Sequence, residues 1–175
     1  QATDGYFQLG YGPNQKGVAE AVVAHPQDAL TLATNPAGLV FVGNQFNASL
    51  AAFSPDRGYT GTGTGFIAPG SHDSGQSLFG IPSLSYSRQI DGDSAWGVAF
   101  YGNGGMNTAY SAFANPNCGG GTGVFCGGKA GVDLTQAFLS VGYARKFGAL
   151  SVGVAPVLAV QRFKANGLAA FAGNS

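Results

Sequence analysis

The stretch LSVGVAPVLAVQRF at residues 150–163 alternates apolar side chains with small or polar ones. The even-numbered positions carry the apolar residues Leu150, Val152, Val154, Leu158 and Val160. The opposite face carries Ser151, Gly153, Ala155 and Gln161. Successive side chains of a β-strand point to opposite faces, so this pattern predicts a strand with one apolar face. We expect the even-numbered residues to face lipid and the odd-numbered residues to face a lumen.

Working outward, the same alternation recurs at residues 45–53, 81–90, 95–101 and 134–146. The sequence therefore predicts an all-β, antiparallel fold with about five strands. Short connections at 91–94 and Gly148 alternate with long ones at 54–80 and 102–133. Short periplasmic turns and long extracellular loops are typical of transmembrane β-barrels of the bacterial outer membrane.

Three aromatic residues, Tyr86, Trp96 and Tyr143, lie towards the short-turn ends of these strands, where a membrane barrel carries an aromatic girdle. The alternative is ordinary packing in a soluble β-sandwich. Five strands are fewer than the roughly eight that close a membrane barrel. We therefore expect a truncated barrel portion from a longer protein. A barrel closed jointly by several chains is the alternative.

Composition supports the membrane interpretation. Charged residues make up 9% of the 175 residues, hydrophobic residues 45%, and Gly contributes 30 positions. The formal net charge is zero, and no basic cluster predicts a nucleic-acid partner. Disorder requires low hydrophobicity and high net charge, which this chain lacks. No segment reaches the roughly 18 consecutive apolar residues of a transmembrane helix.

The N-terminal residues 1–42 have a different character and form a predicted domain of their own, followed by the strands at 43–175. Residues 16–24 and 28–34 predict two short helices, the second ended by the dipeptide Asn35-Pro36. Helices of this length are not stable alone, so each must dock on something larger. No signal peptide is present. Either a signal has been removed, with Gln1 near the mature start, or the protein is not exported.

The two cysteines, Cys118 and Cys126, enclose a glycine-rich segment. No His or third Cys lies nearby, so the pattern predicts neither a zinc site nor any other metal or cofactor site. We expect a local disulfide and hence an oxidising compartment. Two unpaired loop thiols are the alternative.

Several blocks, taken in order, resemble one known family. They are DALTLATNPAGL at 28–39, FSP at 53–55, IPSLSY at 81–86, WGVAFYGNGGMN at 96–107 and VLAVQRFK at 157–164. Together they resemble the long-chain fatty acid outer-membrane transporters of the FadL/TodX type, over most of the chain. The resemblance implies an outer-membrane barrel of roughly fourteen strands, within the even-numbered bacterial range. It also implies an N-terminal hatch in the lumen, which is the role expected for residues 1–42.

The resemblance further implies passive transport of hydrophobic compounds, most of all long-chain fatty acids, by a protein that is a monomer when complete. Aromatic hydrocarbons are the other substrate class. The hatch must shift to open a path, and a kink in the third strand lets substrate leave sideways into outer-membrane lipid. The implied partners are thus a hydrophobic small molecule and lipid, with no cofactor.

Three sets of site residues follow. The hatch corner that could control passage is Asn35, Pro36, Ala37 and Gly38. The expected strand kink is Gly102, Asn103, Gly104 and Gly105, a run that could instead open the extracellular loop. The candidate substrate contacts are Tyr6, Phe7, Phe66, Phe79 and Phe113, each of which could equally be loop packing.

Two other function classes compete with transport. A lipid-modifying outer-membrane enzyme needs a nucleophile and a histidine base, and the histidines are His25 and His72. Ser71, His72 and Asp73 are adjacent in sequence, so triad geometry is not expected and we predict no catalytic residues. A structural or adhesin-like surface barrel is the second alternative, and it needs no hatch.

Overall fold

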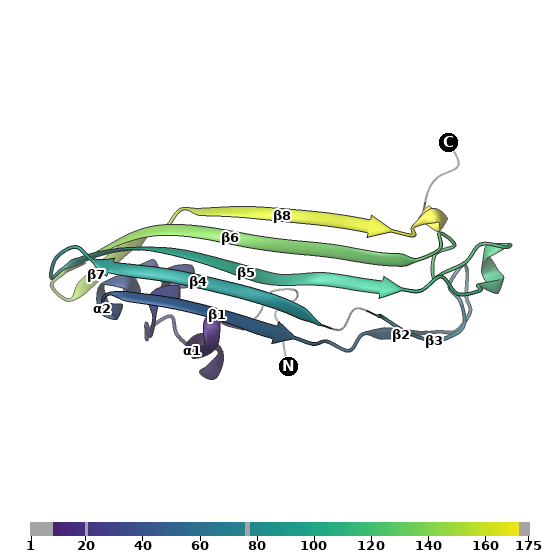
Figure 1. Ribbon diagram of the computed structural model, residues 1–175, viewed down its shortest axis with the longest axis horizontal. Helices are drawn as coiled ribbons and strands as arrows, with labels where there is room; N and C mark the ends of the chain where they lie inside the picture. Colours follow the sequence, from purple (N-terminus) through teal and green to yellow (C-terminus); the bar gives the residue numbers. More distant parts are fainter. Residues whose placement is uncertain (1–8, 20, 76–77, 172–175) are drawn as a thin grey trace. The chain divides into compact units, whose positions relative to one another are not determined.

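The computed structural model describes residues 9–19, 21–75 and 78–171 and shows a mostly β protein with antiparallel pairing and few short helices (Figure 1). The larger sheet has the order β1-β4-β5-β6-β7, and β8 also pairs with β6. Across the described residues this sheet stays open and does not close into a barrel. A separate two-stranded sheet pairs β2 with β3.

The strands have the following bounds: β1 Gln45–Phe53, β2 Gly58–Gly61, β3 Gly70–Asp73, β4 Phe79–Gln89, β5 Ser94–Tyr110, β6 Ala130–Phe147, β7 Leu150–Val154 and β8 Val157–Asn166. The helices are all short: α1 Gly12–Gly17, η1 Ala29–Ala33, η2 Pro36–Gly38, α2 Leu39–Val42, η3 Pro116–Cys118 and η4 Ala169–Phe171, where η marks a 3₁₀-helix. The chain divides into two compact units, which are described separately.

Unit 1 comprises residues 1–52, 80–104 and 136–161. Its strands β4 and β5 pair from Ser83 opposite Tyr101 to Gln89 opposite Ala95, and β6 and β7 pair from Tyr143 opposite Val154 to Phe147 opposite Leu150. The buried core joins both parts of the unit. It consists of Leu30, Leu32, Leu39 and Val42 from the N-terminal segment and Ala95, Ala99, Tyr101 and Ala144 from the strands.

The β4–β5 turn has the conformation that its Asp-Gly-Asp-Ser sequence favours. The amide of Asp93 donates to Oδ1 of Asp91 at 2.9 Å, and the amide of Ile90 donates to the carbonyl of Ser94 at 2.9 Å. A hydrogen bond from the Ser94 side chain and then one from the Asp93 backbone hold the pKa of Asp91 below its usual value. The expected short turn is therefore confirmed.

Unit 2 comprises residues 53–79, 105–135 and 162–175. It contains the β2–β3 hairpin, with Gly58 opposite Asp73, and the disulfide between Cys118 and Cys126. The long connections expected at 54–80 and 102–133 thus have regular structure of their own. The expected disulfide is confirmed.

Several expected element bounds are wrong. The fourth strand begins at Ala130 and not at Leu134. The third strand does not end at Tyr101, because β5 continues through Gly102–Gly105 to Tyr110. The fifth strand is not continuous, because Pro156 separates β7 from β8; proline has no N–H to donate to a ladder. Pairing with β6 persists across the break, since the amide of Val141 donates to the Pro156 carbonyl at 3.2 Å.

The first expected helix is also misplaced. Its described residues after Gly17 form turns, and Glu20 lies outside the described residues. The helix α1 instead has Pro13 in its first turn, where proline is tolerated, and it ends before the β-branched residues Val22 and Val23. The second expected helix is present as η1, with Asp28 at its N-terminal cap.

Candidate functional site

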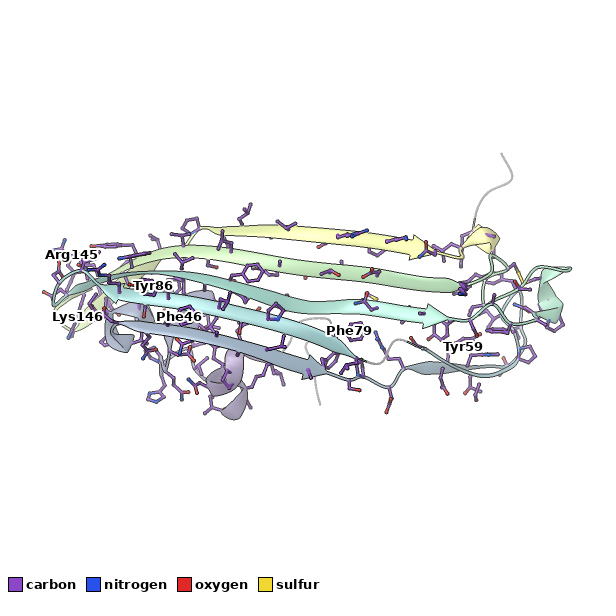
Figure 2. The ribbon with its side chains drawn as sticks, in the orientation of Figure 1. Phe46, Tyr59, Phe79, Tyr86, Arg145 and Lys146 are labelled. Atoms are coloured by element: carbon purple, nitrogen blue, oxygen red, sulfur yellow. A yellow bond between two sulfur atoms is a disulfide. The ribbon has the colours of Figure 1, made fainter. Side chains whose placement is uncertain are left out.

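The sheet of unit 1 has two chemically different faces. One face exposes large apolar side chains, among them Phe46 and Leu50 of β1, which are 70% and 75% exposed. It continues across the other strands with Leu84, Tyr86, Phe100, Leu139, Val141, Tyr143, Leu150, Val152 and Val154. Figure 2 shows the side chains along these strands and labels Phe46 and Tyr86. The alternation expected for residues 150–154 is confirmed: Ser151 and Gly153 are the less exposed members.

The opposite face is lined by small and polar side chains and is covered by the N-terminal segment, residues 9–19 and 21–44. Ser83, Ser85, Ser87, Ala95, Ala99, Ser140 and Ala144 are buried there. The hydroxyl of Ser87 donates to the Gly43 carbonyl at 2.7 Å, and Nε2 of Gln89 donates to the Val40 carbonyl at 3.2 Å. Polar strand residues thus bond directly to the backbone of the segment that covers them.

The helix α1 adds an aromatic contact. The ring of Tyr11, at the N-terminal cap of α1, lies 4.4 Å from the ring of Tyr101 on β5. The ring of Phe138 on β6 stacks on Tyr101 at 5.4 Å, and the Tyr101 hydroxyl lies 3.2 Å from the Ser140 hydroxyl. Partial burial lowers the pKa of Lys16 on the same helix.

The helix η1 is anchored through the buried carboxylate of Asp28. Its Oδ1 accepts the Leu30 amide at 2.9 Å, and its Oδ2 accepts from Nδ2 of Asn14 at 2.8 Å. The same carboxylate therefore caps η1 and links it to α1. The amide of Ala29 also donates to Oδ1 of Asn47 on β1, at 3.4 Å.

The expected hatch corner is a compact turn, and the Asn35 side chain makes no cap hydrogen bond to η2. Its Nδ2 instead donates to the Val23 carbonyl at 2.7 Å, so it ties the corner to an earlier turn of the chain. The amide of Asn35 donates to the Thr31 carbonyl at 2.7 Å, and the amide of Gly38 donates to the Asn35 carbonyl at 2.9 Å. The structure thus brings all four corner residues together and binds them to the preceding segment.

At three glycines of the strands, the covering segment packs closely against the sheet. Their role is not apparent from the sequence alone. A Cβ added at Gly97 of β5 would lie 3.1 Å from Cδ2 of Leu39. One at Gly142 of β6 would overlap Cδ1 of Leu32. One at Gly153 of β7 would lie 2.5 Å from the Pro36 carbonyl carbon and 2.8 Å from Cα of Ala37. We call Gly97, Gly142 and Gly153 the glycine seats.

The expected kink residues lie inside β5, at the boundary between the two units. Unit 1 ends at Gly104 and unit 2 begins at Gly105. A Cβ at Gly102 would lie 3.0 Å from Cγ2 of Ile81, and one at Gly105 would overlap the Leu134 carbonyl. Asn103 is 5% exposed. The run therefore does not open the loop at this point.

The expected substrate contacts separate into different clusters of unit 2. Phe66 packs edge-on against Phe125 at 6.0 Å and against Phe171 at 5.3 Å. Phe113 stacks on the His72 ring at 3.9 Å. Phe79 lies under the guanidinium of Arg57, at 5.4 Å. Tyr6 and Phe7 lie outside the described residues.

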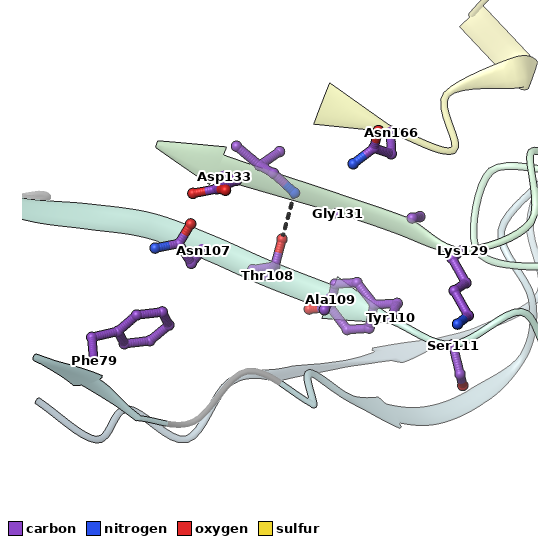
Figure 3. A pocket seen from close by; sticks show the side chains of 12 residues that line it. Phe79, Asn107, Thr108, Ala109, Tyr110, Ser111, Lys129, Gly131, Asp133 and Asn166 are labelled. Atoms are coloured by element: carbon purple, nitrogen blue, oxygen red, sulfur yellow. Dashed lines mark hydrogen bonds between the residues drawn. The ribbon is translucent and has the colours of Figure 1, made fainter. Parts of the chain in front are cut away.

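Phe79 also lines an open pocket of about 740 Å³ in unit 2 (Figure 3). The other walls come from residues 107–111 of β5 and its end, residues 129–133 of β6 and its start, and Asn166 of β8. Lys129 and Asp133 supply charges, and Tyr110 supplies a second ring. Burial, together with Tyr110, raises the pKa of the neighbouring Tyr59, whose ring lies 5.4 Å from that of Tyr110.

The disulfide loop is bonded to the β2–β3 connection by two asparagines. Nδ2 of the buried Asn115 donates to the carbonyls of Phe66 and Gly123, both at 2.9 Å. Nδ2 of Asn117 donates to the Ile67 carbonyl at 2.9 Å. The two long loops of unit 2 are therefore joined by side chain to backbone bonds next to Cys118.

The Ser71-His72-Asp73 cluster lies on β3, where successive side chains point to opposite faces. His72 faces the Pro69 carbonyl, with Nε2 at 3.2 Å, and the Ser71 hydroxyl lies 3.0 Å from that of Thr60. The structure therefore does not assemble these three residues into a triad. Among the described residues, no group of three or more His, Cys, Asp or Glu could hold a metal ion.

Comparisons with protein families, with curated proteins and with solved structures find no match to this chain. Within the described part of the chain, no helix has the length and apolar character needed to span a membrane.

Proposed function

We propose that this chain supplies part of the wall and the plug of a bacterial outer-membrane protein through which hydrophobic compounds, most of all long-chain fatty acids, diffuse passively. The observation that carries the proposal is the two-faced sheet of unit 1. Its exposed face is apolar from β1 to β7, and its other face is polar, small and covered by the N-terminal segment.

The apolar face favours lipid over water as its surroundings. Phe46, Leu50, Val154 and Leu150 are each more than 60% exposed, and they belong to one sheet. Contiguous apolar surface of this extent is rare on monomeric soluble proteins, which cover theirs with charged residues. The strands of a membrane wall alternate apolar-out with polar-in, as these do, and we propose that further strands of the complete protein pair with the open edges of this sheet.

The N-terminal segment supports the role of a hatch that rearranges. Its helices have three to six residues and are not stable alone. They hold their place through the core shared with the strands, through hydrogen bonds to strand side chains and through the glycine seats. Because helices this short depend on the strands for their conformation, a local change in these contacts can reposition them, which suits a plug that must shift to let a substrate pass.

Gly102–Gly105 supports lateral release. Glycine weakens strand structure and favours bulges, and this run has three glycines within β5. We propose that substrate leaves the lumen here into the bilayer. In the complete protein, the pocket beside Phe79 offers a ring for an alkyl chain and the ammonium of Lys129 for a carboxylate. Both features suit a fatty acid.

Uptake by cells tests the proposal. The complete protein, with Asn35→Ala or Pro36→Ala, is produced in cells that lack their own fatty acid importer, and uptake of a labelled long-chain fatty acid is measured. Asn35→Ala removes the bond to Val23, and Pro36→Ala frees φ and restores a donor. We expect both changes to alter uptake while the barrel still assembles.

Heat-modifiable mobility on gels provides the folding control for both variants. Normal uptake with correct folding in both variants would make the corner a simple helix stop. Uptake lost together with barrel folding would assign the corner a structural role and remove the support for gating.

A further inference from the structure

The exposed face of unit 1 carries two arginines at its turn end, among aromatic rings. Even-numbered residues of β4 and odd-numbered residues of β6 are the exposed ones, which places Arg88 and Arg145 on the apolar face. We call the group Tyr86, Arg88, Trp96, Tyr143 and Arg145 the arginine–aromatic belt. Figure 2 shows Tyr86 and Arg145 towards the same end of the sheet.

The strand register places the belt residues in two groups, one on β4 and β5 and one on β6 and β7. Arg88 of β4 lies directly opposite Trp96 of β5, and the ring of Tyr86 packs edge-on against Trp96 at 5.5 Å. On β6, Tyr143 pairs with Val154 and Arg145 pairs with Val152 of β7. The guanidinium of Arg145 lies 5.6 Å from the ring centroid of Phe147. The charges are thus set among rings and apolar side chains.

The guanidinium groups of Arg88 and Arg145 are accessible to a ligand outside the protein. Within the described residues, no ion pair involves Arg88. Asp91 and Asp93 lie in the adjacent β4–β5 turn, and the Asp91 carboxylate accepts hydrogen bonds at that turn and also attracts Arg145. A guanidinium offers paired donors that match a phosphate, and it is more weakly hydrated than an ammonium.

We propose that Arg88 and Arg145 bind the phosphate groups of anionic phospholipids where the apolar face meets the membrane interface at the turn end. This inference rests on the proposed function, which puts the apolar face in lipid. Tyr and Trp rings collect at the headgroup level of a membrane, and Tyr86, Trp96 and Tyr143 mark that level on this sheet. An arginine beside them reaches the phosphates while its aliphatic part stays in the apolar region.

Lys146 provides a matched control within the same strand. It follows Arg145 directly, but its ammonium lies 5.8 Å from the ring of Phe41 in α2, on the covered face of the sheet. Figure 2 labels Lys146 at the same end of the sheet as Arg145. Removing its charge changes the net charge as much as removing that of Arg145, without touching the lipid-facing surface.

Trp96, the only tryptophan of the sequence, reports the lipids beside Arg88. The protein is inserted into equimolar vesicles of phosphatidylglycerol and phosphatidylcholine in which one lipid or the other has brominated acyl chains. Bromine quenches tryptophan fluorescence at short range, so the two samples give the relative affinity of each lipid for the site. We expect phosphatidylglycerol to be preferred, and Arg88→Gln to reduce the preference about fivefold, which corresponds to about 1 kcal/mol.

The remaining variants sharpen the result. Arg88→Lys keeps the charge and should retain most of the preference, Lys146→Gln should retain all of it, and Arg88→Gln with Arg145→Gln should abolish it. Quenching by both lipids in proportion to their mole fractions would overturn the headgroup site and leave the membrane location intact. No quenching by either lipid would show that this face does not contact the membrane, which contradicts the proposed function as well. An equal loss in Lys146→Gln would reduce the effect to net charge and would also overturn the site.

Discussion

Replacing Gly153 by Ala should release the hatch corner from β7. The added Cβ would lie 2.5 Å from the Pro36 carbonyl carbon and 2.8 Å from Cα of Ala37, and closer still to the Ala37 amide nitrogen. All three are backbone atoms, which cannot rotate away, so the corner itself must move. Overpacking of this kind costs about 1–3 kcal/mol. The ratio of docked to released corner should therefore fall by a factor of about 5 to 150.

Hydrogen–deuterium exchange followed by mass spectrometry measures this change. The amides of Asn35 and Gly38 donate to carbonyls within the segment, so their exchange should accelerate by the same factor as the corner opens. Gly80→Ala on β4 is the control, because its Cβ would meet only Cδ1 of Leu50 at an ordinary 3.6 Å. Unchanged exchange at Asn35 and Gly38 in a folded Gly153→Ala protein would refute the role assigned to this seat.

Two further predictions follow from the wall and the loop. Val154→Arg on the exposed face of β7 should lower the free energy of unfolding in lipid by up to about 1 kcal/mol, because Val154 pairs with Tyr143 near the membrane interface. Ser151→Arg on the other face should cost less; folding titrations in vesicles that found Ser151→Arg the more damaging would reverse the assignment of the two faces. Reducing the disulfide, whose cysteines are 8 residues apart, should destabilise its loop by about 2–3 kcal/mol from chain entropy; denaturant curves that coincide with and without reductant would contradict this.

The interiors of the strands were predictable because alternation is a local signal. Burial alternates along residues 45–53, and β1 has the predicted bounds. The residue parity of 150–154 likewise predicted which side chains are exposed. Burial on one face imposes this period on the sequence, so each strand reveals its own faces without reference to its neighbours.

The ends of the strands were less predictable, because pairing with neighbouring strands determines where a strand ends. Gly102–Gly105 carries no alternation, yet β5 continues through it, and the backbone of Gly105 packs closely on the carbonyl of Leu134 in β6. Conversely, the alternation at 150–163 continues across Pro156, where the structure has a break. Pairing with β6 extends β5, and the missing N–H of Pro156 divides the expected strand at 150–163. Hydrophobic periodicity shows neither effect.

The candidate site was likewise predictable only in part. The corner at 35–38 was recognisable from its Asn-Pro sequence, but the acceptor of the Asn35 side chain is Val23, which only the folded chain brings near. The glycine seats leave only a weak signal in the sequence: each is a glycine on the covered face of an alternating strand, where the alternation alone would allow a larger side chain. What each seat receives depends on long-range packing, so the sequence could not pair Gly153 with Pro36 and Ala37.

The order of the chain has a consequence for how this structure is assembled. The N-terminal segment is synthesised before the strands, but the glycine seats lie on β5, β6 and β7, and most of the chain separates Pro36 from Gly153. Contacts between distant parts of a chain form late, because a long loop must close before they can be made. Its short helices cannot hold their conformation in the meantime. We therefore expect the N-terminal segment to dock after the strands have paired, so that the covered face of the sheet is briefly exposed during assembly.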